Sequence, residues 1–144
     1  MADNAPKQPQ VILGQGKKLA DDLRRVRLAA PKDEVRSYLN TVAIAPSLIA
    51  GQGYDLVATD AHQLIVYGQP HEDHEDYALM DHPNLASLIK AISPIRGQVA
   101  LTLDKEMFTW AVHTRENDLF NSGGREVETG LLRNLTYPLS LIHI

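Results

Sequence analysis

The sequence of 144 residues lacks cysteine and long apolar runs, and only 6% of its residues are aromatic. Without cysteine, the chain can have neither a disulfide framework nor a thiolate metal site or a cysteine nucleophile. No apolar stretch approaches the roughly 18 residues of a membrane-spanning helix. The first ten residues are polar, contain Pro6 and Pro9, and have no signal-peptide core. We therefore expect a soluble protein, with the cytoplasm as its default location.

Neither sign of charge dominates, since 14 basic and 18 acidic residues give a net charge of −4. The chain as a whole is therefore not a polycation that seeks phosphate. The charges are unevenly placed, however: five of the basic residues lie between Lys17 and Arg27, and acidic residues crowd residues 71–81. A content of 44% hydrophobic residues is sufficient for the core of one ordinary domain without disulfides or metals.

Two amphipathic helices are predicted, because apolar residues recur at helical spacing in two segments. The first helix covers residues 16–30, and the second starts at Asp81 or His82 and runs to Ile92. The apolar stripes comprise Leu19, Leu23, Val26 and Ala30 in the first helix and Leu85, Leu88, Ile89 and Ile92 in the second. Each stripe is expected to face the core.

Short runs rich in β-branched and aromatic residues predict strands around these helices. They cover residues 11–13, 35–39, 54–59, 63–67, 77–80, 98–103, 107–113, 119–122 and 125–128. Gly14 is expected to close the first strand. The third and fourth runs should form a β-hairpin about a tight Asp60-Ala61 corner, and the last two pairs of runs should form hairpins as well. We expect one α+β domain over residues 11–138, preceded by a flexible leader of residues 1–10.

Two patterns of titratable residues suggest a metal site or an active site. Residues 71–76, HEDHED, with His82 beyond them, contain metal-ligating side chains, but they follow Pro70 and lack an apolar stripe that would hold a helix in place. We interpret the segment as a solvated acidic loop. Asp60 and His62 lie two residues apart without a nucleophile elbow. We therefore expect no catalysis, no resident metal and no cofactor.

The most distinctive pattern combines VRSYLN at residues 35–40 with VATDAHQL at residues 57–64. Together and in this order the two motifs resemble the middle domain of the bacterial DNA polymerase III sliding clamp, the beta clamp, whose corresponding motifs are VRYYLNG and VATDGHRL. The resemblance implies one clamp-like domain with two helices packed on antiparallel sheets. The departures are Ser37 for an aromatic residue, Thr41 and Ala61 for glycines, and Gln63 for an arginine.

The resemblance implies a DNA-binding role for the basic side of the first helix. In clamps the helices line the central hole, so this side would contact the phosphates of duplex DNA independently of sequence. The alternative is a solvated helix surface, and Asp21 and Asp22 dilute its positive charge. The tyrosine of the YLN motif would also face the duplex, or else be a half-buried strand residue. The implied DNA-binding residues are Lys17, Lys18, Arg24, Arg25, Arg27, Tyr38 and Lys90.

A second site implied by the resemblance is an apolar pocket for short clamp-binding peptides of polymerase or repair proteins. Its residues would be Leu39, Thr59, Ala61, His62, Gln63 and Leu64. For Leu39 a half-buried strand residue is again the alternative. Ala61 narrows the pocket by a methyl group and Gln63 removes a fixed charge, so we expect an altered preference for partners.

The sequence as a whole is interpreted as a processivity factor, or a single-domain relative or fragment of one, that tethers replication or repair proteins to duplex DNA. The alternative is a clamp-like interaction module of phage or plasmid type, which binds partner peptides or interferes with a host clamp without encircling DNA. A clamp ring needs about six such domains, so a lone domain would form a homo-oligomer through edge strands or belong to a longer protein.

The last six residues, 139–144, have the sequence LSLIHI. They match one reading frame of the mosaic-end adaptor used in transposase-based sequencing libraries. We interpret them as a cloning or assembly artefact, and the alternative is a genuine apolar terminal strand.

Overall fold

The computed structural model describes residues 10–30, 40–46, 53–59, 64–67, 77–114 and 125–134. The elements are β1 (Gln10–Gln15), α1 (Gly16–Arg27), β2 (Thr41–Pro46), β3 (Tyr54–Thr59), β4 (Leu64–Tyr67), β5 (Ala78–Asp81), α2 (His82–Ile92), β6 (Gln98–Asp104), β7 (Thr109–Thr114) and β8 (Glu126–Leu131). Two helices and two antiparallel sheets confirm the predicted α+β class.

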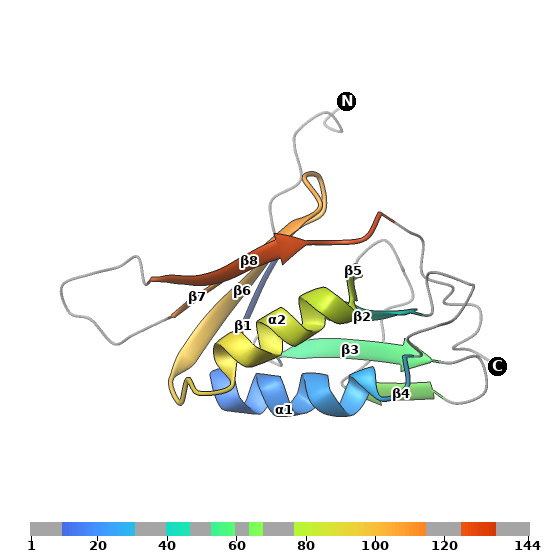
Figure 1. Ribbon diagram of the computed structural model, residues 1–144, viewed down its shortest axis with the longest axis horizontal. Coiled ribbons are helices and arrows are strands. Elements are labelled where there is room, and N and C mark those ends of the chain that lie inside the picture. Colours follow the sequence, from blue (N-terminus) through green and yellow to red (C-terminus); the bar gives the residue numbers. More distant parts are fainter. Residues whose placement is uncertain are drawn as a thin grey trace.

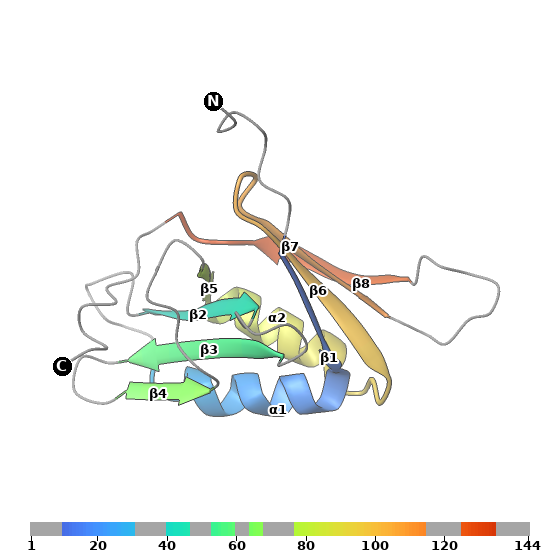
Figure 2. The same cartoon turned by 180° about the vertical axis from the view of Figure 1, so that it is seen from behind.

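The two sheets are interlocked. One has the strand order β1-β6-β7-β8 and the other β4-β3-β2-β5, and every pair is antiparallel (Figures 1 and 2). Along the chain, a strand, a helix and three strands occur twice in succession. The first strand of each half pairs with strands of the other half, since β1 joins β6 and β5 joins β2. Neither half therefore completes its own sheet.

The helices α1 and α2 lie side by side in both views and run in opposite directions (Figures 1 and 2). The start of α1 is joined to the segment after α2, because Gly16 N–H donates to Gly97 O over 3.0 Å and Lys17 N–H donates to Ile95 O over 3.0 Å. A Cβ on Gly16 would lie 2.6 Å from Ile95 O, so the close approach of the two segments depends on this glycine.

The predicted apolar stripes of both helices are confirmed, because all eight residues are buried in one core with the inner faces of both sheets. The helix α1 ends at Arg27, earlier than expected, and residues 28–30 continue as tight turns. The helix α2 begins at the predicted place. Its N-cap is Asp81, whose side chain accepts a hydrogen bond from Asn84 N–H over 3.1 Å, and Pro83 stands in the first turn.

Two predicted strand boundaries need correction. Gly14 does not end β1. It lies within the strand and pairs with Val99, because β1 pairs with β6 over its full length. Met107 and Phe108 form the β6–β7 turn and not the start of β7, with Phe108 at a φ of 53°. The strand β8 pairs with β7. The partner predicted for β8 lies outside the described residues, as do the strand at 35–39, the acidic segment 71–76 and the tail 139–144.

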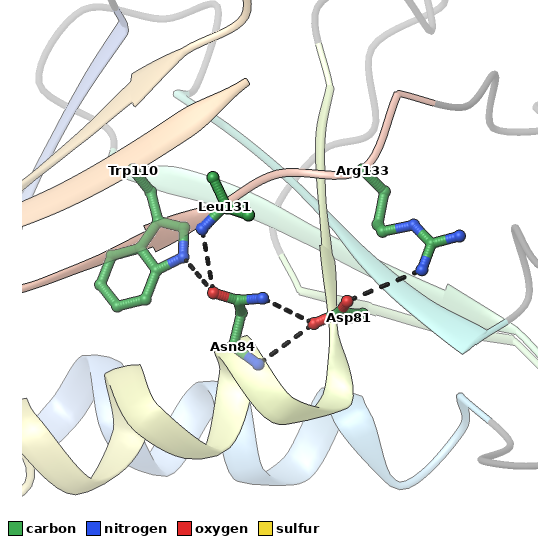
Figure 3. A network of polar contacts seen from close by, with 5 residues as sticks. All are labelled: Asp81, Asn84, Trp110, Leu131 and Arg133. Atoms are coloured by element: carbon green, nitrogen blue, oxygen red, sulfur yellow. Dashed lines mark hydrogen bonds and ion pairs between the residues drawn. The ribbon is translucent and has the colours of Figure 1, made fainter. Parts of the chain in front are cut away.

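A polar network connects both sheets to the start of α2 (Figure 3). The side-chain oxygen of Asn84 accepts hydrogen bonds from Trp110 Nε1 over 2.9 Å and from Leu131 N–H over 3.0 Å. Its amide nitrogen donates to Asp81 Oδ1 over 2.8 Å, and Arg133 forms an ion pair with the other Asp81 oxygen at 3.7 Å. The network fixes the N-terminal end of α2 against the edge where the two sheets meet.

Candidate nucleic-acid interface

The six basic residues predicted to bind DNA lie on the helix pair, and the seventh predicted residue, Tyr38, lies outside the described residues. Five of them belong to α1 and Lys90 belongs to α2. All are exposed except Arg27, which is half-buried. The structure therefore brings six cationic side chains onto the two helices that lie side by side (Figure 1).

These six cations differ in how they are held. Arg24 forms an ion pair with Asp21 at 2.9 Å, and Lys18 forms one with Asp22 at 3.2 Å. Within the described part of the chain, no carboxylate lies at ion-pair distance from the other four, which are Lys17, Arg25, Arg27 and Lys90. Four charges on this face are therefore available to an external anion.

Asp22 lies below the basic face and offsets one of its charges, because it forms the ion pair with Lys18. Asp22 is only 2% exposed, and its carboxylate accepts a hydrogen bond from the Tyr54 hydroxyl over 2.5 Å. Tyr54 belongs to β3, so the buried carboxylate holds α1 on the second sheet. The two helices thus carry six basic residues and two acids, Asp21 and Asp22, although the whole chain has a net charge of −4.

A shallow groove of about 470 Å³ separates α1 from α2. Three cations line it, and no acidic residue does. The lining comprises Arg24, Arg27, Ala86, Ile89, Lys90, Ser93 and Pro94. Arg24 crosses between the helices, because its Nη2 donates to Ser93 Oγ over 2.9 Å while its Nη1 donates to Asp21 Oδ1.

Arg96 is a further exposed cation that the sequence interpretation missed. Its carbonyl accepts a hydrogen bond from the Gln15 side chain over 2.9 Å, directly before the start of α1. Arg96 therefore lies at the same end of the helix pair as Lys17. The sequence carried no signal for this proximity, because the two segments are about 80 residues apart and meet only in the folded chain.

The predicted peptide site is only partly described. The hairpin formed by β3 and β4 is confirmed, and Thr59 and Leu64 form its last pair in the register. The other four predicted residues, Leu39, Ala61, His62 and Gln63, lie outside the described residues, together with the predicted Asp60-Ala61 corner. The backbone therefore brings Thr59 and Leu64 together at one end of an edge hairpin.

In the part of the chain that the structure describes, neither helix is long and apolar enough to cross a bilayer. The same residues contain no group of three metal-ligating side chains. The HEDHED segment that was weighed as a metal site lies outside them.

Comparison with known proteins bears on the fold. No family model matches the sequence, and no curated protein matches it. Among solved structures, DNA polymerase III subunit beta from Borrelia burgdorferi, in complex with a natural product, is similar with a TM-score of 0.64 at 18% sequence identity. The alignment covers 100% of this chain and 35% of that one, so this chain spans about a third of its length. The chain thus has the clamp-like α+β fold of part of a DNA polymerase III beta subunit.

Proposed function

We propose that this chain is a clamp-like unit that binds duplex DNA through its helix pair and holds replication or repair proteins on it. The observation that carries the proposal is the charge on the helices, where six basic side chains outnumber two acids in a chain of net charge −4. The fold supports the proposal, because the similar solved structure is a DNA polymerase III beta subunit.

The chemistry expected at this face is phosphate neutralisation. Lysine and arginine side chains on helix surfaces contact phosphate oxygens, which carry no sequence information, and each contact releases condensed counterions. Binding should therefore depend strongly on salt and little on sequence. Such binding suits a protein that moves along DNA. We expect no chemical step, so the unit would be an accessory factor.

Removal of two unpaired cations tests this interface. We expect Lys17→Gln with Arg25→Gln to weaken binding to a duplex oligonucleotide about tenfold or more at low salt and to reduce the slope of log K against log salt by about 1.8. Fluorescence anisotropy over a salt series measures both quantities. The matched control is Lys105→Gln with Arg125→Gln, which removes the same charge from the β6–β7 turn and the start of β8.

The two double variants separate the DNA role from general electrostatics. Equal weakening by both pairs would show attraction to the overall charge, and an absence of duplex binding by the parent chain at low salt would rule out the DNA role. If the chain does not bind duplex DNA but does bind partner peptides, the alternative function holds, which is a clamp-like interaction module without DNA.

We further propose that partner proteins dock by short peptides at the end of the β3–β4 hairpin. Support comes from the resemblance of the VATDAHQL motif and from the pairing of Thr59 with Leu64 in the hairpin. We expect Leu64→Ser to weaken binding of a labelled clamp-binding polymerase peptide at least fivefold, because about 1 kcal/mol or more of apolar contact would be lost. Leu131→Ser, at a residue that is 64% exposed on β8, is the matched control. Equal binding by both variants would place the peptide elsewhere.

A further inference from the structure

We propose that the groove between α1 and α2 is a binding site for one backbone phosphate of duplex DNA, which Arg24, Arg27 and Lys90 would hold. This inference rests on the proposed DNA-binding function and makes it specific, because it separates three cations that act together from others on the same face. The occupant is a phosphodiester group with its oxygens directed into the groove.

The lining of the groove supports this occupant. Three of its seven residues are cationic and none is acidic. Among the described residues, no carboxylate is at ion-pair distance from Arg27 or Lys90, so both charges are available in the groove. The small side chains of Ala86 and Ser93 leave room between the helices, and the volume of about 470 Å³ admits a phosphate group.

The position of the cations along α1 supports the same assignment. Arg24 and Arg27 are three residues apart and therefore lie on one side of the helix, where both line the groove shared with α2. Lys18 and Arg25 are seven residues apart on the other flank and do not line it. The basic face is thus divided into a groove part, which two helices share, and an outer part, which α1 carries alone.

Arg24 is oriented before any ligand arrives. Its guanidinium donates to Asp21 on α1 and to Ser93, the residue directly after α2, both over 2.9 Å. A guanidinium carries five N–H groups, so these two bonds leave three for a phosphate. A side chain already fixed in place loses little conformational freedom on binding. Ser93 is therefore a positioning residue for Arg24, although it carries no charge.

The first test compares two triple variants of equal charge. The groove variant removes the three cations of the groove and combines Arg24→Gln, Arg27→Gln and Lys90→Gln. The outer variant removes three exposed cations outside the groove and combines Lys17→Gln, Arg25→Gln and Arg96→Gln. We expect the groove variant to lose at least fivefold more affinity for a duplex oligonucleotide than the outer variant. Equal losses would overturn the groove assignment and leave the proposed function standing. Absence of duplex binding by the parent chain would instead overturn the proposed function.

The second test changes no charge. We expect Ser93→Ala to weaken duplex binding two- to threefold with an unchanged salt slope, because Arg24 loses one of its two anchors. Ser87→Ala, at an exposed position of α2 that does not line the groove, should leave the affinity unchanged. Equal affinities of these two variants would overturn the positioning role.

Inorganic phosphate distinguishes the DNA backbone from a free anion. We expect millimolar phosphate to cause only weak, unsaturated amide shifts at Ala86 and Ser93 in NMR spectra, and the duplex to cause saturable shifts of the same amides. Saturation by inorganic phosphate alone, without a response to duplex, would assign the groove to a small anion and overturn the proposal.

Discussion

Replacement of Gly130 by alanine is expected to lower the free energy of unfolding by about 3 kcal/mol. A Cβ at this position would lie under 3.0 Å from both the Asn84 side-chain oxygen and the Trp110 ring. Neither neighbour can give way easily, because Trp110 is only 1% exposed and Asn84 is held by Asp81 and by the backbone of Leu131. The methyl group would therefore push β8 from the position where it completes the network (Figure 3).

A second glycine provides the control for this substitution. A Cβ on Gly97 would meet nothing within 4 Å, and its backbone does not have a positive φ. Gly97→Ala should therefore leave the stability within about 0.5 kcal/mol of the parent chain. Urea unfolding, followed by the fluorescence of the single tryptophan, measures both variants. A loss below about 1 kcal/mol for Gly130→Ala would mean that β8 can shift at little cost.

The helices were predictable because the signals that form them are local. The stripes at helical spacing identified the residues that each helix buries, and Asp81 before Pro83 identified the start of α2. The hairpin of β3 and β4 was also predictable, since its two strands are close in sequence. The exchange of β1 and β5 between the halves of the fold was not predictable from periodicity, because strand pairing over long sequence distances leaves no local pattern.

The candidate DNA site was predictable in composition but not in geometry. The charged face of α1 follows from helical spacing, which places Lys17 and Arg25 away from the apolar stripe. Burial of Asp22 could not be predicted, because it depends on the Tyr54 hydroxyl from a strand 32 residues away. The anchoring of Arg24 by Ser93 spans 69 residues and likewise exists only after folding. The resemblance to clamps suggested the function that we propose for this face, and the fold supplied its three-dimensional form.

Replacement of Asn84 by alanine is the second change with a large expected effect, about 2–3 kcal/mol of lost stability. The variant removes the acceptor of the indole N–H of Trp110, a residue that is only 1% exposed. It also removes the acceptor of Leu131 N–H and the donor to the N-cap Asp81. Ser87→Ala, on the exposed side of the same helix, should change the stability by less than about 0.5 kcal/mol.

A double-mutant cycle with Trp110→Phe identifies the source of the Asn84 effect. Phenylalanine has no N–H, so in that background Asn84→Ala leaves no indole donor unpaired. Its cost should therefore fall by about 1 kcal/mol or more. Urea unfolding of the four proteins, followed by circular dichroism because two of them lack the single tryptophan, gives this coupling energy. An unchanged cost would show that Asn84 stabilises the fold through Asp81 and Leu131 alone, in which case the core tryptophan would not connect the first sheet to α2.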